Sequence, residues 1–179
     1  MIPAWKIFGR LGNSMFQYAF LYAYARDKGI DFYFQDIKFF KKYASEIKAL
    51  FGQGIIKLDQ VGIHVRRGDY VNNPMYVDLM KTGYYERAME QFKGESFLVF
   101  SDDIEWCKEQ EIFRGCEFSK GNDEIGDMNL LAGCKGIIMA NSSFSWWCAF
   151  LSDAKVIAPK EWYRDGVERT KCLPEWTRM

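Results

Sequence analysis

The 179-residue sequence contains a single histidine, His64, and its five cysteines are widely spaced, with no CxxC pair among them. A Ser-His-Asp triad or a histidine-rich metal cage would have to use this one imidazole. The scattered, odd-numbered thiols are typical of small buried cysteines in a reducing compartment rather than of zinc or redox sites. These shortages exclude much of hydrolytic, zinc and disulfide chemistry.

Charge of one sign and long apolar runs are also missing. Lysine plus arginine and aspartate plus glutamate balance at 24 each, so no field attracts nucleic acid or anionic lipid over the whole surface. No apolar run approaches the roughly 18 to 20 residues that cross a bilayer, and residues 1–10 lack the layout of a signal peptide. We expect no nucleic-acid partner and no secretion, and any phosphate site must be local.

From residue 61 onward, short apolar runs alternate with longer amphipathic segments. The runs span residues 61–65, 97–100, 116–118, 136–140 and 155–158, and the amphipathic segments span 84–92, 104–110, 124–134 and 144–151. This alternation predicts an α/β fold, a doubly wound parallel sheet wrapped by helices. Ligands of such sheets bind beyond the carboxyl ends of the strands, where residues 64–69, 101–103 and 141–145 are expected.

The front of the chain has a different pattern, so we expect a small lobe over residues 1–56 and a nucleotide-binding lobe over 57–179. An apolar segment at 5–8 precedes a glycine-flanked turn and a helix from about Ser14 to Lys28, which Gly29 would end. A second helix is expected across 37–51. The tail after Glu161 has no clear period.

Three segments carry candidate chemistry. The first is GRLGN at 9–13, where glycines and helix amides suit a phosphate, or where Asn13 simply caps the helix. The second is HVRRGDY at 64–70, where strand alternation sends His64 and Arg66 to one side. A guanidinium there can clamp a diphosphate, or both arginines can pair with Asp69 and neighbouring carboxylates.

The third segment runs from residue 123 to 151 and contains Asp127 on a helix. An apolar strand then ends in NSSFS at 141–145, at the start of another helix. Hydroxyls and amides at such a helix start form an anion site, although Ser142 or Ser143 can equally serve as a plain N-cap. The tryptophan pair at 146 and 147 is more typical of core packing than of a stacking platform.

In this order, GRLGNSMFQYA, HVRRGDYV and DMNLLAGCKGIIMANSSFSWWCAFL resemble the signature set of the bacterial α-1,2-fucosyltransferases, glycosyltransferase family 11. SDDIEWCK at 101–108 and YFQDIKFFKKY at 33–43 strengthen the likeness, which covers most of the chain. The resemblance implies a GT-B-like architecture with a Rossmann-like lobe for GDP-fucose, a galactose-containing glycan as acceptor, inversion at the sugar, and no metal or other cofactor. It also implies a bacterial cytoplasmic protein with at most peripheral membrane contact.

Residue roles follow from the same resemblance. His64 would contact the guanosine, Arg66 the β-phosphate and Asp127 the guanine edge. The donor-binding set implied is His64, Arg66, Arg67, Asp127, Ser142, Ser143, Phe144, Gly12 and Asn13. Arg66 and Asn13 would stabilise charge on the leaving diphosphate, and Asp69 is a candidate catalytic base that the sequence does not assign.

The chain departs from the family pattern at Ser14, where glutamine is usual, and at Cys148, where glycine is usual. It is also shorter than the family, with material missing near residues 28–32 and 52–54, so the small lobe is expected to be incomplete. A non-catalytic GDP-sugar-binding module is therefore the main alternative to an enzyme. A response-regulator-like phosphoryl site at Asp102 and Asp103 is a third hypothesis, which leaves the three motifs unexplained.

Overall fold

The computed structural model describes residues 11–28, 43–167 and 172–179. The chain divides into two compact units, Met1–Gln53 and Gly54–Met179, whereas the sequence suggested a boundary after residue 56. Each unit is built around its own packed elements, and the second carries the sheet.

In the first unit, α1 (Leu11–Lys28) and α3 (Ala44–Phe51) contact each other. The Tyr22 hydroxyl donates to Glu46 Oε2 over 2.7 Å, and the rings of Tyr18 and Phe51 meet edge to face at 5.7 Å. The expected strand at 5–8, the Gly29 cap and the start of the helix at 37–42 lie outside the described residues.

The described part of α1 corrects one expectation. The helix already includes Leu11, so Gly12 and Asn13 lie within it, and Asn13 is not the residue that caps its start.

The second unit is built on a six-stranded, all-parallel sheet in the order β3-β2-β1-β4-β5-β6. Its strands are β1 (Leu58–Val65), β2 (Phe97–Ser101), β3 (Glu117–Phe118), β4 (Cys134–Ile138), β5 (Lys155–Ala158) and β6 (Thr177–Arg178). This is the strand order of the Rossmann fold, and the expected α/β class is confirmed. The short strand β6 was not predicted, because the tail after Glu161 has no apolar run or clear period.

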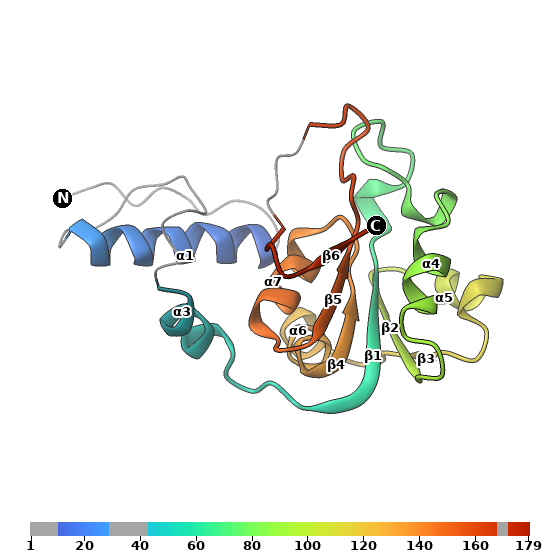
Figure 1. Ribbon diagram of the computed structural model, residues 1–179, viewed down its shortest axis with the longest axis horizontal. Helices are drawn as coiled ribbons and strands as arrows, with labels where there is room; N and C mark the ends of the chain where they lie inside the picture. Colours follow the sequence, from blue (N-terminus) through green and yellow to red (C-terminus); the bar gives the residue numbers. More distant parts are fainter. Residues whose placement is uncertain (1–10, 29–42, 168–171) are drawn as a thin grey trace. The chain divides into compact units, whose positions relative to one another are not determined.

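Helices cover both faces of the sheet (Figure 1). They are α4 (Tyr84–Glu90), α5 (Ile104–Lys108), α6 (Glu124–Gly133) and α7 (Ser143–Leu151), with 3-10 turns at Gly68–Tyr70, Leu79–Lys81 and Glu111–Phe113. A Cβ on Gly62 of β1 would lie 2.4 Å from Leu131 of α6, and one on Gly136 of β4 would lie 2.4 Å from Phe92, which follows α4. Since Gly136 is paired with Val61, neighbouring residues of β1 face opposite layers.

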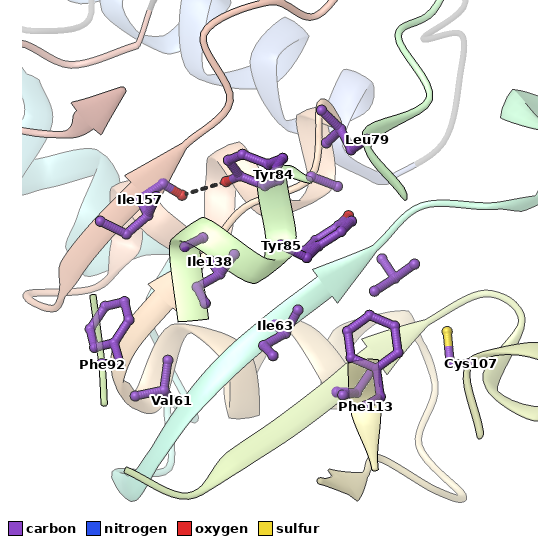
Figure 2. Close-up of a cluster of buried hydrophobic side chains, with 14 residues drawn as sticks. Val61, Ile63, Leu79, Tyr84, Tyr85, Phe92, Cys107, Phe113, Ile138 and Ile157 are labelled. Carbon is purple, nitrogen blue, oxygen red and sulfur yellow. Dashed lines mark hydrogen bonds between the residues drawn. The ribbon is translucent and has the colours of Figure 1, made fainter. Parts of the chain in front are cut away.

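The core on the α4 face holds apolar side chains from β1, β2, β4 and β5 and two tyrosines (Figure 2). The Tyr84 hydroxyl donates to the carbonyls of Met139 (2.8 Å) and Ile157 (3.0 Å). The Tyr85 hydroxyl donates to the carbonyl of His64 over 3.0 Å. These two buried phenols therefore hold three neighbouring strands near their carboxyl ends.

Trp146 and Trp147 are fully buried in α7, which confirms the packing interpretation of this pair. All five cysteines are free thiols, and Cys107, Cys134 and Cys148 are buried. Of the helices that the structure describes, none combines the length and apolar character that crossing a bilayer requires.

Candidate functional site

The polar segments singled out from the sequence follow β1 and β4, which are neighbours at the centre of the sheet. Strand order reverses between them, because β2 and β3 lie beyond β1 while β5 and β6 lie beyond β4. In open parallel sheets this switch point opens a crevice at the carboxyl ends of the two strands. Residues 64–70 and 139–145 flank that position.

His64 lies on the sheet face covered by α6 and α7, because it alternates with Ile63 and Val65 of the α4-side core. Its ring is 5.1 Å from the ring of Phe144, at the start of α7. His64 is 5% exposed, and no described residue is a hydrogen-bond partner of its Nδ1 atom. Burial lowers the pKa of His64 to about 3; Asp102 opposes this shift and Arg66 adds to it. The imidazole is therefore neutral, with one buried nitrogen able to meet a ligand.

Arg66 emerges just after β1 and is held from three sides. Its Nη1 lies 2.8 Å from Asp102 Oδ2, and its Nη2 pairs with Asp69 Oδ1. Its Cζ is 5.2 Å from the ring centroid of Tyr70, which itself stacks on Tyr76 at 3.7 Å. The guanidinium, 10% exposed, is thus fixed between two carboxylates and an aromatic face.

Arg67 points toward the other layer, as strand alternation predicts. Its Cζ lies 3.5 Å from the ring centroid of Trp106 on α5, and its Nε is 3.8 Å from Asp103 Oδ2. Its backbone amide donates to Asp102 Oδ1 over 2.8 Å. The interpretation that both arginines pair with carboxylates is confirmed, and their contact with a donor stays a prediction.

Asp127 lies in the first turn of α6. Its Oδ1 accepts from the Ser119 hydroxyl over 2.6 Å and from Asn122 Nδ2 over 3.3 Å. Burial raises the pKa of Asp127, and the two hydrogen bonds act in the opposite direction. The carboxylate is fixed in place by neutral donors, with no arginine or lysine among its recorded partners in the described part of the chain.

The segment after β4 caps α7 and anchors the chain at the carboxyl end of the sheet. Ser142 is the N-cap of α7 and accepts from the amide of Phe144 over 3.3 Å, which confirms the capping interpretation. Asn141 Nδ2 donates to the carbonyls of Val77 and Trp162, both at 3.0 Å. Ser143 and Phe144 are partly exposed beside these anchored residues. The N-terminus of α7 thus follows the carboxyl end of β4, the position at which a helix start can bind an anion in such sheets.

The structure brings His64 and Phe144 together and gathers Arg66, Arg67 and Asp69 around Asp102. Asp127 lies on the same sheet face as His64, on α6, which packs against α7. Gly12 and Asn13 belong to the first unit, and their predicted donor contact stays a prediction. Within the described ranges, no group of three or more His, Cys, Asp or Glu side chains is arranged to hold a metal ion.

Sequence reasoning missed two features of this site. Asp102 was expected at the carboxyl end of a strand and was given a role only in a response-regulator-like site, yet it joins both arginines to the end of β2. Tyr85 was assigned to a helix without a role, yet it fixes the carbonyl of His64. Two sequence signals could have indicated these roles. Asp102 comes directly after a predicted strand, and Tyr85 lies in the helix that connects two predicted strands.

The model of a known family, described as glycosyl transferase family 11, matches residues 10–179. The chain belongs to glycosyl transferase family 11. Among its relatives, an Escherichia coli protein named alpha-1,2-colitosyltransferase is 35% identical over 176 residues, covering 82% of this chain and 61% of the relative. The O-antigen biosynthesis glycosyltransferase WbnK of Escherichia coli is 32% identical over 131 residues, covering 65% and 43%.

A mammalian relative, galactoside alpha-(1,2)-fucosyltransferase 2 of Oryctolagus cuniculus, is 33% identical over 109 residues, which are 54% of this chain and 31% of that protein. The glycosyl transferase family 11 chain therefore spans less than two thirds of the length of each of these relatives.

Proposed function

We propose that the chain binds GDP-fucose at the carboxyl ends of β1 and β4 and transfers L-fucose to the 2-hydroxyl of a galactoside, with inversion and without a metal. The observation that carries the proposal is Arg66 at the switch point of a Rossmann-ordered sheet, in a chain that belongs to a glycosyltransferase family. The colitosyl and fucosyl relatives differ in the sugar named and share the alpha-1,2 linkage, which supports the linkage more than the sugar.

The chemistry requires stabilisation of the departing diphosphate. When the bond between fucose and the β-phosphate breaks, negative charge grows on the phosphate oxygens. Arg66 offers a fixed guanidinium, and the first amides of α7 offer a helix N-terminus for this charge. Each such contact typically lowers the barrier by about 2.7–4 kcal/mol.

The nucleoside would be read by neutral and anionic groups. His64 Nδ1, buried and uncharged, would contact the guanosine, with Phe144 packed against the imidazole. Asp127 would accept from the N1–H and N2–H₂ edge of guanine, which a carboxylate matches and which adenine lacks. Ser143 would meet the phosphate or nucleoside through its backbone.

Transfer itself is an in-line attack by the acceptor hydroxyl on the face opposite the diphosphate, which converts a β-linked donor into an α-linked product. A carboxylate would take the proton from the hydroxyl as the new bond forms. Asp69, exposed and close to Arg66, is our candidate for this base.

The test is calorimetric titration of the folded chain with GDP and GDP-fucose, for wild type and Arg66→Ala. We expect binding that Arg66→Ala weakens by about a hundredfold or more. A galactoside-acceptor assay on the same sample, with GDP-fucose and GDP-colitose as donors and with and without EDTA, then tests transfer, donor sugar and metal independence. Binding without transfer would favour the alternative of a GDP-sugar-binding module, and no binding would overturn both.

A further inference from the structure

Carboxylates outnumber guanidinium groups where the diphosphate is proposed to bind. Arg66 and Arg67 face Asp69, Asp102 and Asp103, so the cluster is net negative. A diphosphate adds at least two further negative charges, and like charges a few ångströms apart repel strongly in a partly buried site. The diphosphate can therefore bind favourably to this cluster only if one carboxylate moves away from its arginine partner.

We propose that Asp69 is an exchangeable counter-ion of Arg66 that the diphosphate displaces, whereas Asp102 is a positioning residue that stays paired with Arg66. The inference rests on the proposed function, because it takes the incoming anion to be the diphosphate of the donor.

Asp69 has the properties of a group that can leave. Its side chain is 67% exposed, and it lies on the short 3-10 turn Gly68–Tyr70 outside the sheet. Within the described part of the chain, the recorded partner of its carboxylate is Arg66 alone. An exposed carboxylate that swings into water is rehydrated at once, so giving up this pair costs little.

Asp102 has the opposite properties. Its side chain is 21% exposed, and it follows β2 directly. One oxygen accepts from the backbone amide of Arg67, and the other binds Arg66 Nη1, both at 2.8 Å. Displacing Asp102 would leave that amide and the guanidinium without their acceptor in a part-buried position, which is costly.

The exchange also leaves the geometry of Arg66 intact. Asp69 and Asp102 bind different nitrogens of the guanidinium, Nη2 and Nη1. A phosphate oxygen can therefore accept a hydrogen bond from Nη2 in place of Asp69. Asp102 and the Tyr70 ring would still hold the guanidinium group in its position. The two aspartates should consequently have opposite effects on donor affinity.

The experiment compares GDP affinity by calorimetry in wild type, Asp69→Asn and Asp102→Asn. We expect Asp69→Asn to bind GDP about two- to fivefold more tightly, because a competing charge is gone. We expect Asp102→Asn to bind about tenfold or more weakly, because Arg66 is no longer held. Asp69→Ala, which also removes hydrogen bonding to Arg66, should match Asp69→Asn.

Asp59→Asn is the matched control. Asp59 lies near the amino end of β1, is 98% exposed and pairs with Lys135, so its substitution changes net charge equally at a distance from the site. Its GDP affinity should equal that of wild type. Circular dichroism and thermal melting establish that each variant is folded.

The outcomes separate the inference from the proposed function. Suppose that wild type binds GDP, that Arg66→Ala abolishes this binding, and that Asp69→Asn and Asp69→Ala bind GDP no more tightly than wild type. This result overturns the proposed exchange, while the proposed function stands. Equal tightening in Asp59→Asn also overturns it, because the effect would then be one of net charge. A folded wild type without affinity for GDP overturns both.

Discussion

The hydroxyl of Tyr85 on α4 donates a hydrogen bond of 3.0 Å to the backbone carbonyl of His64, the last residue but one of β1. The tyrosine lies on one face of the sheet, and the imidazole of His64 lies on the other, against Phe144. The strand end that carries the candidate site is thus anchored from the face opposite to the one that would meet the ligand.

This bond predicts a cost for Tyr85→Phe. The substitution keeps the ring in the core but leaves the buried carbonyl of His64 without its donor, so the free energy of unfolding should fall by about 1–3 kcal/mol. Urea denaturation measures the change. Tyr18→Phe, at a ring that is 42% exposed, should change it by less than about 0.5 kcal/mol. Equal stability of the two variants would show that the Tyr85 bond contributes nothing.

The buried imidazole predicts a pH dependence of stability. The pKa of His64 is about 3 in the folded protein, against about 6.5 when unfolded, because burial disfavours the cation. Between these values the unfolded chain binds a proton that the folded chain does not. Stability should therefore fall as pH drops below about 6.5, by at most about 1.4 kcal/mol per pH unit from this group.

Two measurements check this expectation. His64→Gln should remove the contribution, seen as a shallower fall in unfolding free energy between pH 6.5 and 5 than in wild type. Because His64 is the only histidine in the chain, its imidazole signals in an NMR titration are assigned without mutation. An imidazole that becomes protonated near pH 6.5 in the folded protein would refute the prediction.

We predict that Gly68→Ala lowers GDP affinity as well as stability. Gly68 has a φ of +31°, and a Cβ there would lie 2.5 Å from Asp102 Oδ2. Gly68→Ala should lower stability by about 1–2 kcal/mol through its backbone conformation and should also push Asp102 away from Arg66. We expect GDP affinity to fall about tenfold.

Gly83→Ala is the control for Gly68. Gly83 has a φ of +67°, and its Cβ would meet the ends of two flexible side chains, Arg87 at 3.0 Å and Glu86 at 3.9 Å. A similar loss of stability with unchanged GDP affinity is expected. If both variants lost affinity equally, the contact between Gly68 and Asp102 would not explain the defect.

We predict that Asp127 makes the site select guanine over adenine. The recorded hydrogen bonds to this carboxylate from described residues all end on Oδ1, which leaves Oδ2 for the guanine edge. Asp127→Asn should weaken GDP binding by about 10- to 150-fold and leave the weak binding of ADP nearly unchanged. Glu124→Gln, at an exposed position on the same helix, should alter neither affinity. A loss of equal size for GDP and ADP would remove Asp127 from base recognition.

Much of the second unit follows from its sequence because each buried strand is a short apolar run between polar turns. The runs at 61–65 and 155–158 fall within the observed β1 and β5, and strand alternation correctly separates Arg67 from His64. The capping role of Ser142 is similarly local, since it depends on a residue two positions along the chain.

Contacts between distant segments could not be read in the same way. Asp102 reaches the amide of Arg67 across 35 positions of the chain, and Tyr84 reaches the Ile157 carbonyl across 73. The pairing of each arginine with a particular carboxylate depends on the order of the strands in the sheet. The spacing of apolar residues along the sequence does not reveal that order. The helical state of Gly12 and Asn13 could not be predicted even from neighbouring residues, because glycine and asparagine are compatible with positions before a helix or within it.

The central place of β1 has a consequence for synthesis. Its partner β4 starts at Cys134, some seventy positions downstream of Val61, with β2 and β3 lying between them in the chain. A nascent chain that has left the ribosome only as far as α6 holds β1 with one edge unpaired, an open template for another polypeptide. The proposed donor site is completed only when β4 and α7 emerge, so we expect it to form late, and a stalled product would expose the unpaired edge of β1 before it could bind a donor.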